Sequence, residues 1–370
     1  MWESTADEAD LSVLNPGVPD GLDRRPDVAV VGGGVLGLAI AALCIREGTA
    51  SVVVLERDRL ASGASGRNAG ALAPEPHVWT DPPALVNLGR RSLRLTRALN
   101  AEWDGVLGLQ DLDCLFIGAG TMEAPMPWDV QVEFLDEQGV REREPALAGV
   151  TEALLITRQA RVDPLRFAAG LAHHAGTVAT GVHVTGRKVQ RSRVTTLTTT
   201  IGELHPGIVV FATGVAPRPD VDVPHHHVKG HLATTEPVAF RLSAQIGAPG
   251  GGALQLADGR LLTGGTLDEG DESPIVRPDV VQELRRGLDD LIPMVASVPF
   301  SHAWCGFRPA VPDRLPIIDR VPALENAWFT SGHYRTGVTM AVATAEAVAQ
   351  WIATGERPHH VLPFALARFT

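Results

Sequence analysis

Three glycines near the N-terminus have the spacing of a loop that binds the phosphates of a dinucleotide. Gly32, Gly34 and Gly37 lie within the run VAVVGGGVLG at residues 28–37. Gly32 permits a tight turn, Gly34 lets the backbone approach a pyrophosphate, and Gly37 lets the next helix pack on the strand. The first helical turn, beginning near Val35, offers free N–H groups to the phosphates. Glu56, 24 residues after Gly32, is placed to accept hydrogen bonds from ribose hydroxyls.

These residues need a strand, a helix and a second strand to hold them, and the sequence predicts all three. Residues 28–31 and 52–55 are apolar and β-branched, as expected for buried strands. Residues 35–47 read as a helix that ends at Gly48. The predicted fold class is therefore α/β, with a Rossmann-type unit at its front.

Periodicity and end signals predict further elements along the chain. Helices are expected at residues 84–103, 129–139, 164–175 (with Asp163 as N-cap), 278–292 and 337–353. Strands are expected at 112–119, 207–214 and 259–266, and as a hairpin at 182–190 and 193–201. Residues 61–83 form a long loop rich in Gly, Ala and Ser, which is typical of a functional segment.

Composition narrows the class of protein. The length of 370 residues favours about two domains. A formal charge of −11 argues against binding to nucleic acid or to an anionic membrane. Three cysteines give neither metal spacing nor a disulfide framework, so a reduced, cytoplasmic protein is expected.

The sequence predicts no signal peptide, no membrane-spanning helix and no metal site. Residues 1–26 are acidic, lack the apolar stretch of a signal peptide, and are expected to form a disordered lead-in. No window is apolar enough to cross a membrane. Adjacent histidines at 225–227 would point to opposite faces of an extended segment, so no metal is expected there.

Four further segments together resemble the FAD-dependent amine oxidoreductases of the D-amino-acid oxidase family. Residues 62–70 (SGASGRNAG) and 211–214 (FATG) resemble the second and third flavin motifs. Residues 304–318 resemble the substrate-carboxylate segment of glycine oxidase and sarcosine oxidase-like enzymes. Residues 331–338 (SGHYRTGV) resemble the loop and helix N-terminus under their flavin ring. The resemblance extends over about residues 27–370.

The resemblance implies the glutathione-reductase-like FAD fold, in which a Rossmann-type domain is interleaved with a smaller α+β substrate domain. The expected FAD-binding domain comprises residues 27–105, 143–218 and 303–370, and the substrate domain comprises residues 106–142 and 219–302.

The cofactor implied by the resemblance is extended, noncovalent FAD. The N-terminus of the last helix would stabilise negative charge near flavin N1. Cys305 lies one residue from the position where sarcosine oxidase relatives attach their flavin, so covalent attachment is not expected. The residues expected to bind FAD are Gly32, Gly34, Val35, Gly37, Glu56, Arg57, Ser62, Ser65, Arg67, Asn68, Ala69, Gly70, Val184, Thr213, Gly214, Gly332, Gly337 and Val338.

The resemblance also places Arg308, His333, Tyr334 and Arg335 at the substrate. An arginine can pair with a carboxylate through two N–H groups, which a lysine cannot match. The alternative for Arg308 is a structural salt bridge with an aspartate, at position 313 or 319. For Tyr334 and Arg335 the alternative is packing of their own loop.

Three further residues could lie near the active site. His77 and Trp79 could line the entrance to the substrate or pack at the domain interface. His231, which follows a Lys-Gly pair similar to that of the family, could be a neighbour of the active site.

The implied reaction is oxidative deamination of a small amino acid or related amine of the glycine, sarcosine or D-amino-acid class. Hydride passes to flavin N5, water hydrolyses the imine, and O2 reoxidises the flavin to give H2O2. Two alternatives remain open: an amino-acid or opine dehydrogenase subunit that passes electrons to a partner, and a nonenzymatic flavin-binding subunit. Homo-oligomerisation also stays open.

One segment departs from the pattern of glycine oxidase. That enzyme has a tyrosine-containing strand where residues 250–256 (GGGALQL) contain no aromatic side chain. The aromatic wall of the substrate site is therefore either missing or supplied by another segment, and a larger pocket and a substrate other than glycine stay open.

Overall fold

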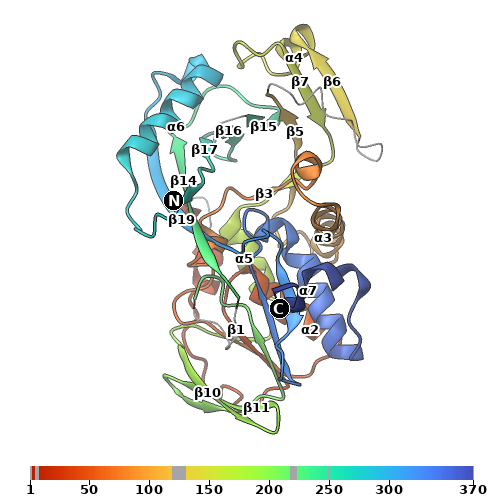
Figure 1. Cartoon of the computed structure of the whole chain (residues 1–370). Helices are drawn as coiled ribbons and strands as arrows, with labels where there is room; N and C mark the ends of the chain where they lie inside the picture. The colour runs from red at the N-terminus through yellow and green to blue at the C-terminus, as the bar shows by residue number, and fades with distance from the viewer. Residues whose placement is uncertain (1, 5–7, 119–130, 217–222, 249–250, 370) are drawn as a thin grey trace.

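The computed structural model describes residues 2–4, 8–118, 131–216, 223–248 and 251–369. Within these residues the chain forms two units, each built on its own sheet (Figure 1). The α-helices are α1 (Glu8–Val13), α2 (Val35–Arg46), α3 (Pro83–Glu102), α4 (Glu137–Arg143), α5 (Pro164–Ala172), α6 (Pro278–Leu291) and α7 (Gly337–Thr354).

The first unit contains a six-stranded sheet in the order β20-β21-β13-β1-β2-β9. Its strands are β1 (Val28–Val31), β2 (Val52–Leu55), β9 (Thr177–Ala179), β13 (Ile208–Phe211), β20 (Ile317–Arg320) and β21 (Ala327–Ser331). All neighbouring strands run parallel except the edge strand β20. This parallel sheet, with β1 at its centre, confirms the α/β fold class.

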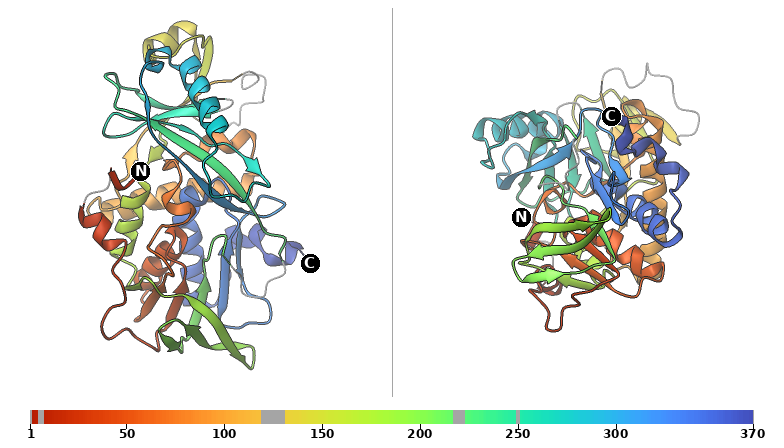
Figure 2. Two further views of the ribbon diagram at one scale, coloured as in Figure 1. Left: turned by 90° about the vertical axis from the view of Figure 1, so that its left-hand side faces the viewer. Right: turned by 60° about the horizontal axis from the view of Figure 1, so that its bottom comes forward.

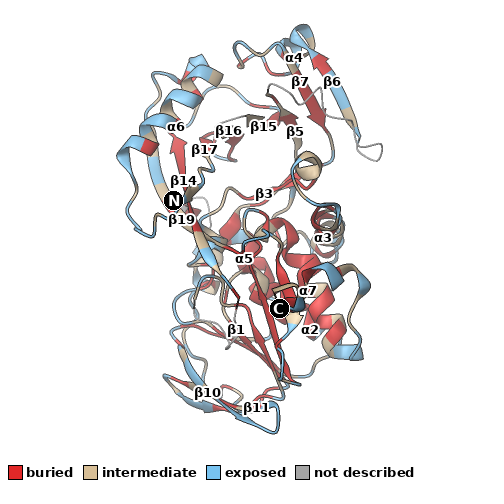
Figure 3. Cartoon of the chain, viewed as in Figure 1, coloured by how far each residue is buried: buried red, intermediate tan, exposed pale blue. Residues whose placement is uncertain are grey.

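The two faces of the six-stranded sheet are covered by different layers. Val28 and Val30 pack with residues of α2, α5 and α7 in one buried cluster. Ala29 and Val31 pack on the opposite face against Leu197 of a three-stranded sheet, whose strands are β10 (Val184–Gln190), β11 (Arg193–Thr199) and β12 (Gly202–Leu204). Figure 3 shows buried residues concentrated in this central sheet and in α2 and α7. Burial on both faces explains why β1 and β2 are continuously apolar.

The second unit is a nine-stranded sheet covered by α6. The spatial order is β18-β14-β17-β16-β15-β5-β7-β6, and β19 pairs with β14. The strands are β18 (Asp268–Glu269), β14 (His226–Thr235), β17 (Leu261–Gly264), β16 (Gly251–Gln255), β15 (Ala244–Ala248), β5 (Asp113–Phe116), β7 (Glu152–Ile156), β6 (Val132–Asp136) and β19 (Phe300–Ala310). Figure 2 shows this unit above the first one, with β19 running down between them.

Short elements connect the two units. A three-stranded sheet joins β3 (Ala71–Leu72), β8 (Ala160–Arg161) and β4 (Gln110–Asp111), and the 3-10 helices η2 (Ala64–Gly66) and η3 (Glu75–Trp79) lie in the loop at residues 61–83. The remaining 3-10 helices are η1 (Trp2–Ser4), η4 (Pro293–Val295), η5 (His359–Phe364) and η6 (Leu366–Phe369).

Most predicted elements are confirmed, but the helix expected at 129–139 is wrong. Residues 129 and 130 lie outside the described residues, and residues 132–136 form strand β6. The helix begins only at Glu137, where the carboxylate of Asp136 accepts a hydrogen bond from the Gly139 N–H. Pairing with β7 outweighs the local helical pattern before that cap.

The N-terminal segment differs from the expected disordered lead-in. Trp2 is 3% exposed, its indole N–H donates to the Asn68 carbonyl at 3.1 Å, and its ring lies 6.4 Å from that of Trp304. Leu14, after helix α1, is also buried. Acidic composition suggested disorder, but two apolar side chains anchor this segment on the folded domain.

Two expected domain boundaries also shift. Strand β7 lies within the stretch assigned to the FAD-binding domain, yet it pairs with β5 and β6 in the second sheet. Strand β19 pairs with β14 as far as Ala310, beyond the expected boundary at residue 303. Long-range strand pairing, which local patterns do not reveal, sets these limits.

Candidate active site

The glycine loop connects β1 to α2 at the carboxyl edge of the six-stranded sheet. Gly32 has φ of +113°, and a Cβ there would lie 2.4 Å from the Ala212 carbonyl oxygen. A Cβ on Gly37 would lie 2.0 Å from the Gly32 carbonyl oxygen. Both contacts require glycine, because the helix, the loop and β13 approach one another through backbone atoms.

Glu56 holds this loop from the end of β2. Its Oε2 accepts a hydrogen bond from the Gly33 N–H at 2.6 Å, and its Oε1 accepts one from the Asp58 N–H at 2.9 Å. The carboxylate therefore fixes the loop as well as facing the pocket beside it.

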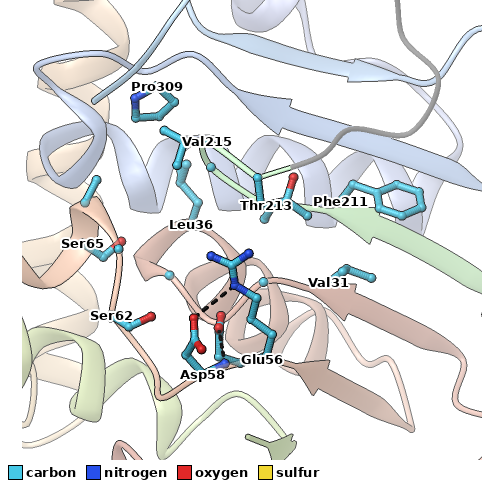
Figure 4. A pocket seen from close by; sticks show the side chains of 18 of the residues that line it. Val31, Leu36, Glu56, Asp58, Ser62, Ser65, Phe211, Thr213, Val215 and Pro309 are labelled. Atoms are coloured by element: carbon cyan, nitrogen blue, oxygen red, sulfur yellow. Dashed lines mark hydrogen bonds and ion pairs between the residues drawn. The ribbon is translucent and has the colours of Figure 1, made fainter. Parts of the chain in front are cut away.

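A pocket of about 370 Å³ extends from the glycine loop toward the second unit. Figure 4 shows Glu56 and Asp58 at one side of it, Ser62 and Ser65 nearby, and Thr213 and Val215 at the other side. The predicted residues that line it are Gly32, Gly34, Val35, Glu56, Arg57, Ser62, Ser65, Asn68, Val184, Thr213, Gly214, Arg308, His333, Tyr334, Arg335, Gly337 and Val338.

The loop at residues 62–70 is held by its own polar side chains. Ser65 Oγ accepts from the Val35 N–H at 3.0 Å, which ties the loop to the start of α2. Asn68 donates to the Ser65 carbonyl at 2.5 Å and accepts from the Gly70 N–H at 2.8 Å. Gly70 has φ of +78° and lies outside the pocket lining.

Four more predicted cofactor residues lie outside the pocket and support it indirectly. Arg67 donates to the Cys305 carbonyl at 3.1 Å and so joins the loop to β19. Gly37 packs beneath the glycine loop, and Gly332, with φ of +74°, lies against Val311. Ala69 lines a second cavity instead.

Arg308 comes from β19 and reaches the junction between the two units. Its Nη1 donates to the carbonyl of Thr266 at 2.9 Å, and burial lowers its pKa. A Cβ on Gly230 would lie 2.3 Å from the same nitrogen, so glycine makes room for the guanidinium. The expected alternatives do not occur, because Asp313 pairs with another arginine and so does Asp319.

The segment before α7 places three predicted side chains differently. Tyr334 has φ of +49°, and within the described structure its buried hydroxyl has no hydrogen-bond partner. Arg335 is exposed and lines both cavities. His333 is 2% exposed, and its Nε2 lies 3.0 Å from Thr344 Oγ1. Burial lowers the pKa of His333 to about 3, so its ring is neutral at physiological pH.

The remaining candidate residues differ in whether they line a cavity. His77 lines the second cavity, whereas Trp79 stacks on Phe116 with ring centroids 6.3 Å apart. His231 is fully buried, and its Nδ1 lies 2.9 Å from Asp268. Cys305 Sγ lies 3.2 Å from the Pro274 carbonyl and lines neither cavity. No group of residues that could hold a metal occurs in the described part of the chain.

Sequence reasoning missed part of the pocket wall. The first half of strand β10 contributes Thr185, Gly186 and Arg187 to the pocket lining. The Arg187 guanidinium lies 6.0 Å from the Phe211 ring centroid. Leu36, Asp58 and Pro309, each adjacent or close to a predicted residue, also line it. Only the packing of the β10–β12 sheet onto the six-stranded sheet brings the hairpin here.

The fit to a flavin dinucleotide rests on three features. The glycine loop leaves a cradle free of side chains, the start of α2 faces the pocket, and the Tyr334 hydroxyl is buried without a partner at its other end. None of the described helices has the length and apolar character needed to span a membrane.

Comparison with known proteins agrees with this geometry. The chain is 28% identical to glycine oxidase of Geobacillus kaustophilus over 94% of this chain and 98% of that protein. The crystal structure of glycine oxidase from the same organism superimposes with a TM-score of 0.84, at 26% identity, covering 94% of this chain and all of that one. Hydrogen cyanide synthase subunit HcnC of Pseudomonas aeruginosa is 25% identical over 94% of this chain and 97% of its own length.

The relatives also include longer proteins. The bifunctional protein ThiO/ThiG of Synechocystis is 28% identical over 90% of this chain, which spans about half of that protein's length (52%).

Removing the Glu56 carboxylate should weaken cofactor retention. We expect Glu56→Ala to lower the FAD content of the purified protein severalfold. Both the Gly33 N–H and the ribose hydroxyls would then lack the carboxylate as a hydrogen-bond acceptor. FAD released by denaturation measures the content. Glu47→Ala, an exposed acid at the end of α2, is the control and should retain FAD; equal content in both variants would contradict this role.

Burial of neutral His333 should make stability depend on pH. The unfolded state binds the proton below about pH 6.5 and the folded state only near pH 3, so stability falls as the pH drops through this window. The slope attributable to His333 is about 1.4 kcal/mol per pH unit. Denaturant unfolding of His333→Asn should give a shallower pH dependence by that amount, whereas the exposed control His302→Asn should keep the wild-type slope.

The family assignment follows from the model that matches this chain. The family described as DAO, FAD dependent oxidoreductase, matches residues 27–351. That match covers the glycine loop, both sheets and the segment before α7 together with most of that helix. The chain therefore belongs to the DAO family of FAD-dependent oxidoreductases.

Proposed function

We propose that this chain catalyses the oxidative deamination of an amino acid or related amine, with O2 as the electron acceptor. The observation that carries the proposal is Arg308, a half-buried guanidinium that forms no ion pair with a carboxylate among the described residues, although the charge of Asp268 acts on it from a distance. Burying a charge is costly unless an opposite charge joins it, so the site is suited to a substrate anion.

The pocket residues would hold FAD along its length. Gly32 and Gly34 would lie against the pyrophosphate with the first turn of α2, and Glu56 would accept from ribose hydroxyls. Val184 and Thr213 would line the adenosine side, and the start of α7 would face the ring. When bound, FAD supplies the acceptor for a hydride at its N5 atom. Cys305 lines neither cavity, and its Sγ lies 3.2 Å from the Pro274 carbonyl, which favours noncovalent binding.

Each side chain near the junction has a separate task in this proposal. Arg308 would hold the substrate carboxylate and so fix the direction of the Cα–H bond. The Tyr334 hydroxyl would donate to the same anion or to the amine, and Arg335 would add positive charge from the solvent side. His333 stays neutral and bonded to Thr344, so it would position the start of α7 and take no proton.

Anaerobic reduction tests the reaction directly. Glycine, sarcosine, D-alanine, D-proline, larger amino acids and aminoethylphosphonate are added in turn to the FAD-loaded protein, and bleaching is followed at about 450 nm. We expect at least one amino acid to bleach the flavin and air to restore the absorbance rapidly. Slow recovery would favour transfer to a partner subunit, and bleaching by none would contradict an amine substrate.

Substitution of Arg308 tests the carboxylate anchor. Arg308→Lys keeps the positive charge but loses the two-pronged geometry, at a cost of roughly 2–4 kcal/mol in transition-state binding, or about 30-fold to 1,000-fold in kcat/KM. Steady-state kinetics with a carboxylate substrate should show the loss mainly in KM. The exposed Arg320→Lys is the matched control. Unchanged kinetics in Arg308→Lys would remove this residue from the site.

A further inference from the structure

A second cavity, of about 670 Å³, continues from the dinucleotide pocket into the second unit. The two cavities share Ala64, Asn68, Arg308 and Arg335, so they meet at the guanidinium groups. A ligand whose anion binds there can therefore extend away from the flavin side into the second cavity.

The second cavity is bounded by the nine-stranded sheet and is mainly apolar. Moving away from Arg308, its wall includes Leu232 on β14, Leu262 on β17, Ile246 on β15 and Phe116 on β5. From β19 to β5 the lining crosses five strand intervals of about 4.8 Å each, or about 24 Å along the sheet. A glycine molecule would fill only a small part of this space.

Small residues leave the far end of the cavity open. Gly251, Gly252, Ala248 and Ala253 line it there and carry little or no side-chain volume. A Cβ on Gly247 would lie 2.8 Å from the Phe116 ring, so glycine lets this ring lie against strand β15. Residues 251–256 contain no aromatic side chain, so the cavity is wide at this end. Phe116, on strand β5, forms an aromatic wall there instead.

The charges in the cavity all lie at one end and are of one sign. Arg67, Arg308 and Arg335 line it on the side of the flavin loop, and the described lining contains no Asp or Glu. At the far end the Cys114 thiol is neutral, because burial raises its pKa to about 12, and Gln245 is an uncharged amide. A second ammonium group on the substrate would thus be buried without an acceptor charge, whereas an apolar group would gain about 25 cal/mol for each Å² buried.

We propose that the substrate is an amino acid with a bulky, apolar substituent. Its carboxylate is held at Arg308, and its substituent crosses the sheet toward Phe116. This inference rests on the proposed amine oxidoreduction and adds the class of substrate. Ala248, at the end of β15, is a specificity-determining residue, because a larger side chain there occupies the space that the substituent needs.

Kinetics of a filled cavity test the assignment. The FAD-loaded wild type should have at least tenfold higher kcat/KM for phenylalanine or leucine, in the reactive enantiomer, than for glycine or alanine. Ala248→Phe should lower kcat/KM for the bulky substrate at least tenfold and leave that for alanine within about twofold. The control Ala303→Phe makes the same change at an exposed position on β19, outside the cavity, and should keep the wild-type preference. Preference for glycine, or an equal loss for both sizes in Ala248→Phe, overturns the proposal.

Binding of unreactive acids separates this proposal from the reaction itself. Acetate and 3-phenylpropanoate are titrated into the FAD-loaded protein, and the change in the flavin spectrum gives each Kd. Tighter binding of 3-phenylpropanoate by at least tenfold, lost in Ala248→Phe and kept in Ala303→Phe, supports the apolar cavity even if no amine reduces the flavin. Equal affinities overturn the proposal even if a small amino acid is oxidised.

Discussion

The closest backbone approach in the dinucleotide site is the constraint on which the rest of the structure depends. Gly32 and Gly37 let β1, α2 and β13 meet with no side chain between them. Glu56 then ties this loop to the end of β2 through the Gly33 N–H. Three strands and a helix are therefore fixed at one point beside the pocket. Rigid elements of this kind position groups more accurately than loops do.

The second unit contributes Arg308 to the pocket through a long strand pair that passes between the two units. Strands β14 and β19 pair from Thr235 and Phe300 at one end to His226 and Ala310 at the other. Gly230 on β14 has no side chain, and the Arg308 guanidinium occupies that space while it donates to the Thr266 carbonyl. The strand pair thus carries a positive charge from the nine-stranded sheet to the edge of the dinucleotide pocket. Neither unit could place it there alone.

The positive charge near the junction comes from arginines, while the buried histidine there is neutral. Arg308 and Arg335 bring positive charge to the junction, while the pKa of about 3 keeps His333 neutral beneath it. The start of α7 adds its own partial positive charge on the same side. An anion is therefore favoured at the junction, and the neutral His333 does not compete for the substrate proton. Beyond the junction the cavity is apolar, so position along it decides whether charge or hydrophobic contact dominates.

The sequence by itself determined the Rossmann-type unit, because that unit depends on local glycine spacing between two apolar strands. The loop at residues 62–70 and Arg308 were predicted from motifs that resemble those of a known family. Glycines at φ above zero, apolar strands and the Asp163 cap are short-range constraints, and the structure has them where they were expected. Tertiary structure alone decided the packing of Trp2 and Leu14, strand β6 and the domain limits. It also decided which side chains line the two cavities: Arg187 in the dinucleotide pocket and Phe116 in the second cavity come from strands far away in the sequence. Their positions follow from strand pairing and burial between segments, and these energies are not contained in any local window.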